Sequence, residues 1–223
     1  MGIRILFSLI IFTAPLAASN PKQVVFSELM WMGSNASSAD EWIELYNRSD
    51  SEIDLSGWTI TRLANDGEVV MVLIEQGSIS PQGTFLIANY PPDNSQSMLA
   101  VNPQQVSPAV SLPNTKLQLR LYNGNPEESA DLLDVADDGK GAPLAGDTKL
   151  KQAMVRLAFD QSGTLGTSWG TARETSGWDE GATERGTPGS IPEYLQMASS
   201  REQTPTDVRT ASWAVLKTSF AEE

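Results

Sequence analysis

Two short alternating segments on either side of a polar turn restrict the fold of this chain more than any other feature. In residues 40–47 (DEWIELYN), Ile43 and Leu45 alternate with polar neighbours, the period of two expected for a half-buried β-strand. Residues 47–52 (NRSDSE) carry short polar side chains that favour a turn. Residues 53–60 (IDLSGWTI) return to a hydrophobic run. The pattern predicts two strands joined by a turn.

Similar segments of strand length recur along the chain. They occupy residues 24–31, 68–74, 84–88, 109–112, 116–122, 130–136 and 153–158. Asn65-Asp-Gly67 between two of them is typical of a hairpin turn, because glycine accepts a positive φ cheaply. Residues 68–74 (EVVMVLI) are apolar on both faces, so we expect a central strand there. Many short strands without a long helical pattern predict an all-β sandwich.

Three tryptophans are expected to belong to the core of this sandwich. Trp58 follows Gly57, which lets its strand pass close to a neighbour, and we expect Trp58 to fill the space between the two sheets. Trp169 and Trp178 come late in the chain. We interpret both as lids over the open end of the core rather than as ligand-stacking residues, since buried aromatic side chains contribute heavily to core energetics.

The two ends of the chain differ in composition from the middle. Residues 1–19 combine Arg4, an apolar run and the small residues Ala17-Ala18-Ser19, which predicts a cleaved secretory signal peptide; the alternative is an uncleaved anchor. We expect no transmembrane segment in the mature chain. Residues 191–223 are predicted to form a linker followed by a short amphipathic helix over 207–220, whose apolar stripe docks on the sandwich or binds a partner.

Composition excludes several kinds of chemistry. The chain has no histidine and no cysteine, which removes Ser-His-Asp and Cys-His catalysis, common zinc sites and disulfides. Its formal net charge is −13, so phosphate repulsion argues against a nucleic-acid partner. We therefore expect no catalytic, cofactor-binding or metal-binding residues, no cofactor and no enzymatic activity.

The acidic residues of the expected strands are the remaining candidates for acid–base chemistry. Glu41 and Glu44 are predicted to lie on opposite sides of one strand, which rules them out as a pair. Glu28 and Glu44 are expected to approach each other across neighbouring strands. We interpret each as the partner of an arginine, such as Arg62 or Arg120, rather than as half of a glycosidase-like pair.

Two clusters of acidic residues raise the alternative of a calcium site. They are Asp131, Asp134, Asp137 and Asp138 in one predicted hairpin, and Asp179, Glu180 and Glu184 in a late loop. Calcium prefers oxygen ligands, but neither cluster has the spacing of an EF-hand loop. Aspartates before a glycine are explained equally well by a turn.

Several segments together resemble the lamin tail domain, the immunoglobulin-like module of nuclear lamins and of many secreted bacterial proteins. These segments are residues 26–30 (FSELM), 40–47 (DEWIELYN), 53–58 (IDLSGW), 79–87 (ISPQGTFLI) and 186–189 (GTPG). The resemblance spans about residues 24–190. It implies an immunoglobulin-like β-sandwich that serves as an interaction module.

Three parts are therefore expected: a signal peptide (1–19), a lamin-tail-like sandwich (24–190), and the C-terminal linker and helix (191–223). The expected function is that of a secreted, non-enzymatic module in the periplasm, at the cell surface or outside the cell, which contacts an unidentified protein or cell-surface partner. The alternative is a calcium-dependent or carbohydrate-binding adhesion domain. That alternative requires exposed aromatic side chains such as those of Trp31, Trp42 or Tyr90.

Overall fold

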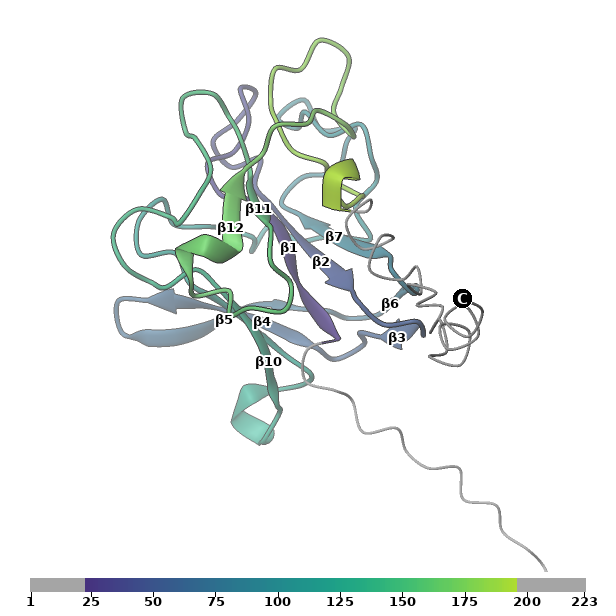
Figure 1. The fold of residues 1–223 in the computed structure, drawn as a ribbon, viewed down its shortest axis with the longest axis vertical. Helices are drawn as coiled ribbons and strands as arrows, with labels where there is room; N and C mark the ends of the chain where they lie inside the picture. Colours follow the sequence, from purple (N-terminus) through teal and green to yellow (C-terminus); the bar gives the residue numbers. More distant parts are fainter. Residues whose placement is uncertain (1–22, 196–223) are drawn as a thin grey trace, which may run out of the picture.

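The computed structural model describes residues 23–195 (Figure 1). The predicted signal peptide and the predicted helix over 207–220 lie outside these residues. Strands and loops dominate the described range. Its helical parts are the 3-10 turns η1 (Pro126–Glu128) and η2 (Gly166–Ser168) and one turn at residues 193–195. Within 23–195 we find no helix of the length and apolar character that crossing a bilayer requires. The predicted all-β class is confirmed.

Six strands form the larger sheet. In spatial order they are β12 (Trp169–Thr171), β11 (Met154–Arg156), β1 (Val24–Met30), β2 (Trp42–Asn47), β7 (Thr84–Ala88) and β8 (Gln105–Val106). Neighbouring strands are antiparallel except β7 and β8, which are parallel. Of the two segments in the opening sequence pattern, residues 40–47 give β2, near the middle of this sheet, whereas residues 53–60 contribute to the other two sheets.

Four strands form the second sheet. Their spatial order is β10 (Leu132–Ala136), β9 (Leu119–Tyr122), β4 (Thr59–Ala64) and β5 (Gly67–Leu73). The predicted turn between β4 and β5 is present, with Gly67 at a φ of 121°. A small pair, β3 (Ile53–Asp54) and β6 (Ser78–Ile79), lies beside the two sheets.

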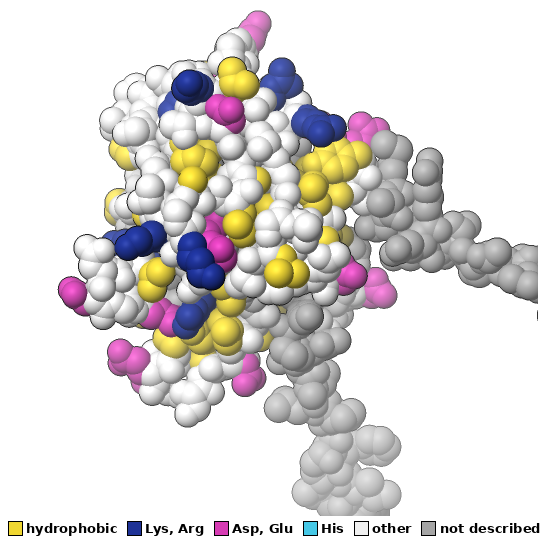
Figure 2. Space-filling view, turned by 60° about the vertical axis from the view of Figure 1, so that its left-hand side comes forward, with side chains coloured by type: hydrophobic (Ala, Val, Ile, Leu, Met, Phe, Trp, Pro, Cys, Tyr) yellow, Lys and Arg dark blue, Asp and Glu magenta, His cyan; other side chains and the backbone are white. Residues whose placement is uncertain are grey.

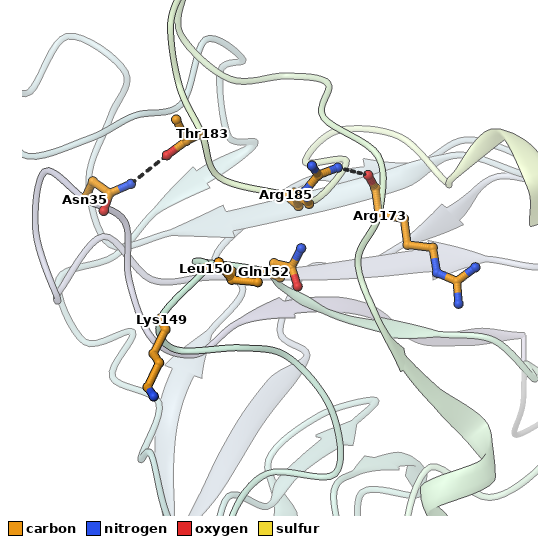
Figure 3. A pocket seen from close by; sticks show the side chains of 7 residues that line it. All are labelled: Asn35, Lys149, Leu150, Gln152, Arg173, Thr183 and Arg185. Carbon is orange, nitrogen blue, oxygen red and sulfur yellow. Dashed lines mark hydrogen bonds between the residues drawn. The ribbon is translucent and has the colours of Figure 1, made fainter.

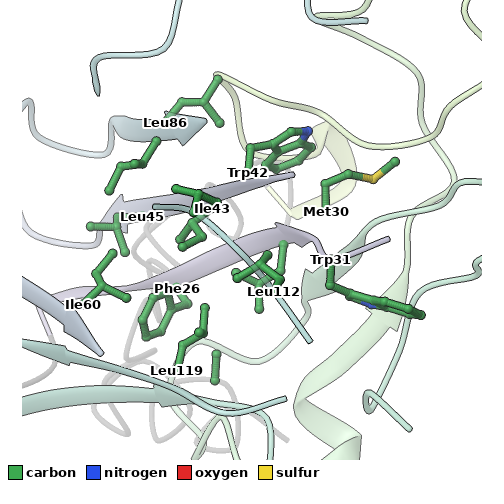
Figure 4. Packing of buried hydrophobic residues seen from close by; sticks show 14 of the residues in the cluster. Phe26, Met30, Trp31, Trp42, Ile43, Leu45, Ile60, Leu86, Leu112 and Leu119 are labelled. Atoms are coloured by element: carbon green, nitrogen blue, oxygen red, sulfur yellow. The ribbon is translucent and has the colours of Figure 1, made fainter. Parts of the chain in front are cut away.

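The two sheets enclose one core, as in an immunoglobulin-like sandwich (Figure 4). Phe26 and Leu45 from the larger sheet and Ile60 and Leu119 from the smaller one are fully buried between them. Trp42 is also fully buried, and its ring centroid lies 6.0 Å from that of Trp178. A close-packed interior of this size explains how the fold stands without disulfides.

Trp58 does not have the central place predicted for it. It is partly buried at the margin of the core, where its backbone N–H donates to the Leu55 carbonyl and its carbonyl accepts from the N–H of Ile74, the residue after β5. Trp42 has the central place instead. Trp169 and Trp178 are buried, as their interpretation as lids requires. Each indole N–H donates to a backbone carbonyl, of Gly163 and Gly186 respectively.

The strand predicted at residues 109–112 is absent. The backbone there is engaged by side chains instead of a neighbouring strand: Asn89 Nδ2 donates to the Val110 carbonyl at 2.7 Å, and the Leu112 N–H donates to Glu41 at 2.8 Å. The chain adds the two-residue strand β8 a few positions earlier.

The prediction that residues 68–74 form a central strand was also wrong. β5 is the last strand of its sheet, and Val70 and Leu73 are 56% and 53% exposed. A run that is apolar on both faces is typical of a strand covered on both sides. In the part of the chain that the structure describes, Met71 and Val72 are buried, whereas the side chains of Val69, Val70 and Leu73 remain exposed.

A β-bulge in β1 separates two residues that simple alternation places on one face. The register of β1 against β2 shifts between Phe26 and Glu28. Phe26 therefore points into the core, whereas Glu28 points to the opposite face of the sheet, which the segment 187–191 covers. The bulge therefore decides on which face of the sheet Glu28 lies.

Candidate functional site

Acidic side chains on β1, on β2 and just before β2 are buried, which is unusual for carboxyl groups without ionic partners. Glu28 and Glu44 are cross-strand neighbours and fully buried. Asp40 and Glu41, just before β2, are 1% and 8% exposed. Each of the four accepts hydrogen bonds from backbone N–H groups of a distant loop. These residues connect the larger sheet to the loops around it.

Glu28 and Glu44 hold the late segment 187–189 against the sheet. Glu28 Oε2 accepts from the Thr187 N–H at 3.1 Å and from its hydroxyl at 2.8 Å. Glu44 Oε2 accepts from the Gly189 N–H at 2.7 Å, and Glu44 Oε1 accepts from the Ser27 hydroxyl at 2.9 Å. The two glutamates and the Gly186-Thr-Pro-Gly189 sequence therefore form a single structural unit.

Burial also changes the proton affinity of these groups. Removal from water disfavours the charged carboxylate, which raises the pKa of Glu28 to about 8 and that of Glu41 to about 7. Burial and the neighbouring Glu28 carboxyl together raise the pKa of Glu44 well above its usual value. The pKa of Asp40 is raised by burial as well.

Asp40 and Glu41 hold the long proline-rich loop between β7 and β9. Asp40 Oδ2 accepts from the Met98 N–H at 2.8 Å, and Glu41 Oε2 accepts from the Leu112 N–H at 2.8 Å. Prolines leave this loop few backbone donors for a ladder. The two carboxyl groups accept hydrogen bonds from two of the remaining backbone N–H groups, and these bonds fix the position of the loop on the sandwich.

The expected approach of Glu28 and Glu44 is confirmed, but the expected arginine partners are not. Arg120 pairs instead with Glu68, its Nη1 lying 2.6 Å from Oε2. Among residues 23–195 Arg62 makes no ion pair. The bulge turns Glu28 toward the 187–189 segment, where Glu44 also points, whereas Arg120 lies on the other sheet. Both buried glutamates are thus engaged in holding backbone rather than facing an open cleft.

The four aspartates of the first acidic cluster diverge. Asp131 bonds Asn123, and Asp138 accepts from the Lys140 N–H within its own turn. Asp137 is buried and accepts from the N–H groups of residues 138, 139 and 144. Asp134 pairs with the fully buried Arg156 at 3.2 Å. The turn interpretation therefore accounts for Asp137 and Asp138, and an internal ion pair accounts for Asp134.

The second acidic cluster does not converge either. Glu184 is fully buried and accepts from the Asn35 N–H at 2.7 Å, while Asp179 and Glu180 are exposed. Within residues 23–195 there is no group of three or more acidic side chains placed to hold a metal ion. Glu184 links the β1–β2 loop to the late loop, which is again a structural connection.

Two of the three aromatic residues expected at the surface are buried. Trp31 is 5% exposed and donates its indole N–H to the Ala145 carbonyl, and Trp42 is fully buried. Tyr90 is half-buried. A stacking platform for a sugar built on Trp31 and Trp42 is therefore excluded, because their faces pack within the protein.

A polar pocket lies where the loops converge at one end of the sandwich (Figure 3). Its volume is about 390 Å³, and its lining residues come from three separate loops: Asn35, Lys149, Leu150, Gln152, Arg173, Thr183 and Arg185. Asn35 donates to the Thr183 hydroxyl at 3.1 Å, and Arg185 donates to the Arg173 carbonyl at 2.6 Å. The side chains of Lys149 and Arg173 extend outward from the rim (Figure 3).

The cations of this pocket lack acidic partners among the described residues. Neither ion pair in residues 23–195 involves Lys149, Arg173 or Arg185. Sequence reasoning missed the pocket, because its residues are far apart in the chain and belong to no motif. The folded loops alone bring them together.

A scan against protein-family models gives one match, to the Lamin Tail Domain, over residues 17–138. This match covers more than half of the chain and includes the two segments of the opening sequence pattern, residues 40–47 and 53–60. The chain belongs to the lamin tail domain family. A search of the curated proteins finds no match to it. The family assigns the chain to a class of non-catalytic, immunoglobulin-like modules.

In this lamin tail domain the folded unit continues beyond the matched residues. β11 pairs with β1, β12 pairs with β11, and the segment 187–189 bonds Glu28 and Glu44. Residues 186–189, one of the segments that resemble the family, therefore have a structural role. Their backbone N–H groups donate hydrogen bonds to Glu28 and Glu44, the buried acidic residues of the central strands.

Proposed function

We propose that this lamin tail domain is a secreted, non-enzymatic interaction module that makes protein–protein or cell-surface contacts through the loop end of its sandwich. The proposal rests chiefly on one observation: buried Glu184 ties the β1–β2 loop to the late loop, and the pocket that these loops line presents Lys149, Arg173 and Arg185. Loops positioned by a rigid scaffold are a common location for binding residues.

The charge distribution supports this choice of surface. The chain as a whole carries a formal net charge of −13. The pocket differs in charge from the rest of the protein, because Lys149, Arg173 and Arg185 make no ion pair within residues 23–195. Arginine and lysine at the rim of an interface contribute mainly to the choice of partner and to the rate of association. An acidic patch on the partner fits these side chains.

Charge reversal tests the loop end directly. We expect the protein to retain a specific partner from the culture supernatant or envelope of its own cells, and we expect Lys149→Glu combined with Arg173→Glu to abolish that retention. Neither side chain holds the fold together, since both are exposed. Lys140→Glu, at an exposed position outside the pocket, is the matched control. Equal retention by parent and double variant would refute the loop end as the binding surface.

Secretion is part of the same proposal and is tested separately. Removal of residues 1–19 is expected on the basis of their charge and apolar pattern. Mass spectrometry of the protein recovered outside the cytoplasm should then give the mass of the chain without these residues. A full-length chain confined to the cytoplasmic fraction would contradict it.

A further inference from the structure

Each cation of the loop-end pocket has an acidic neighbour in the sequence whose carboxylate is engaged elsewhere. The neighbouring pairs are Asp147 and Lys149, Arg173 and Glu174, and Glu184 and Arg185. Asp147 Oδ1 accepts from the N–H groups of residues 149 and 150, at 2.8 and 2.9 Å, and Glu174 Oε2 accepts from the Glu193 N–H at 3.1 Å. The fully buried Glu184 accepts from the N–H groups of residues 35 and 183, at 2.7 and 2.9 Å. Within residues 23–195 the three cations are therefore left without a counter-ion.

The lining of the pocket has a single sign of charge. Basic and acidic side chains are interspersed over the face of the molecule drawn in Figure 2. Among the described residues that line the pocket, three are cationic, the other four are uncharged and none is acidic, although the chain has 28 Asp and Glu against 15 Lys and Arg. A concave site lined by one sign of charge raises the local concentration of oppositely charged ligands. The pocket therefore suits an anion.

Backbone hydrogen bonds connect the segments that form the pocket. Asp147 and Gln152 exchange two of them, of 2.9 and 3.0 Å between N and O. The Arg185 N–H donates to the Lys151 carbonyl, and the Arg185 carbonyl accepts from the Ala153 N–H, both at 2.9 Å. The lining side chains are thus presented by segments that are already fixed to one another. A site that is ordered before binding loses less entropy when a ligand arrives.

Two kinds of polar group remain available in the pocket. Arg185 uses Nη1 to bond the Arg173 carbonyl, but a guanidinium has five donors in a planar fork that matches a carboxylate. The side-chain amide of Gln152 makes no hydrogen bond to a described residue, and Asn35 uses only its Nδ2 there. Amide groups bond hydroxyl groups as donor or acceptor. Leu150, 61% exposed, adds an apolar surface beside Gln152 (Figure 3).

We propose that this pocket binds a hexuronate unit of an acidic polysaccharide, which makes the partner of the loop end a glycan that carries carboxylates. The inference rests on the proposed function, because it assigns a ligand to the same surface. The sugar carboxylate pairs with the side chains of Lys149, Arg173 and Arg185, and the ring hydroxyls bond the available amide groups. The side chain of Leu150 contacts the C–H groups of the ring.

The lining favours an acidic sugar over other anionic ligands. Protein interfaces are enriched in aromatic residues and methionine. Among the described residues that line the pocket, Leu150 alone is apolar and none is aromatic. An acidic peptide side chain also offers no hydroxyl groups to Gln152 and Asn35. Nucleic acids carry a higher density of negative charge, which a chain with a net charge of −13 repels.

Isothermal titration calorimetry with an oligosaccharide of galacturonic acid tests the ligand on the purified protein. We expect saturable binding that weakens with added salt, because salt screens charge pairs at an exposed site. The fully methyl-esterified oligosaccharide is the matched ligand, since it keeps the ring hydroxyls and loses the charge. It should bind at least about tenfold more weakly. Polyglutamate, which carries carboxylates without hydroxyls, should also bind more weakly than the acidic sugar.

Variants of the protein test the pocket itself. Lys149→Gln combined with Arg173→Gln should weaken binding of the acidic oligosaccharide at least about tenfold. Lys140→Gln, at an exposed position outside the pocket, should bind as the parent does. Gln152→Ala should also weaken binding of the sugar, because it removes an amide that bonds the hydroxyls. Unchanged melting temperatures show that the fold of each variant is intact.

The outcomes separate this inference from the proposed function. Equal binding of the acid and its ester, unchanged binding by the double variant, or tighter binding of polyglutamate or single-stranded DNA would each overturn the polysaccharide ligand. If the sugar does not bind while retention of a protein still depends on Lys149 and Arg173, the ligand is wrong and the loop-end module stands. If neither the sugar binds nor retention depends on these two residues, both proposals fail.

Discussion

At the residue scale, the consequence of burying Glu28 is a dependence of stability on pH. The pKa of Glu28 is 4.5 in an unfolded chain and about 8 in the folded one, because burial disfavours the charged form. Between these values the folded protein holds a proton that the unfolded chain releases. By linkage, the contribution of Glu28 to the free energy of unfolding is largest below pH 4.5, falls as pH rises, and stops falling above about pH 8.

Replacing Glu28 by glutamine should remove much of this dependence. Glutamine keeps a carbonyl oxygen for Thr187 but does not titrate. From about pH 5 to about pH 8.5 we expect the melting temperature of the parent to fall by at least ~5 °C, and that of Glu28→Gln to fall less. The chain has no histidine, and the raised pKa values of Glu41 and Glu44 account for the part of the fall that remains in Glu28→Gln. Glu52→Gln, at an exposed turn position, should behave as the parent does. A parent that melts higher at alkaline pH would contradict the argument.

At the scale of elements, the segment 186–189 depends on the absence of a side chain at Gly186. A Cβ atom built there would lie 2.6 Å from Glu28 Oε1 and 3.3 Å from the Ala153 Cβ. The Gly186 carbonyl also accepts from the Trp178 indole N–H. Close packing at this point therefore joins β1, β11 and the late loop.

Gly186→Ala should destabilise the protein through this overcrowding. We expect a loss of about 1–3 kcal/mol in the free energy of unfolding, measured by urea titration. Gly166→Ala is the control, since a Cβ atom there meets its nearest neighbour, Leu144, at 3.8 Å. Equal midpoints for the two variants would show that the segment is not packed as described.

The same elements show what the sequence could and could not predict. Alternation and turn residues were sufficient for β1, β2, β7 and the β4–β5 hairpin, because these signals are local. The bulge between Phe26 and Glu28 was not predictable, since it depends on the register of a partner strand. Sheet order is likewise non-local, which is why residues 68–74 were placed centrally although β5 is an edge.

The candidate site was predicted less well than the fold for a related reason. Glu28 and Glu44 were recognised as neighbours, but their partners lie 159 and 145 residues away along the chain. The sequence analysis predicted arginine partners for both glutamates. Their actual partners are backbone N–H groups of a distant loop. The cationic pocket has no sequence signature at all, because three loops contribute to it.

At the scale of the whole molecule, the folded unit is longer than the family match. Residues 139–195 supply β11, β12 and the segment that satisfies Glu28 and Glu44. Without them β1 becomes an unpaired edge, and two buried acids lose their backbone donors. An uncompensated buried polar group is expensive, so the shorter piece is expected to be unstable.

A truncation experiment tests this boundary. We expect a fragment of residues 17–138 to show no cooperative thermal transition by circular dichroism, whereas a fragment of residues 23–195 melts in a single sharp transition. Backbone amide dispersion in NMR spectra provides an independent measure of tertiary structure. A sharp transition in the shorter fragment would show that residues 17–138 fold without β11, β12 and the segment 187–189, and would contradict the argument.

The bonds between Glu28 and Thr187 have a consequence for how the protein is made. They span 159 residues, so the first strand leaves the ribosome long before its last partner exists. Contacts of such high sequence separation form slowly and only once both ends of the loop are available. Folding therefore cannot finish during synthesis of the first half, and a nascent chain stalled before residue 187 carries two glutamates still open to water.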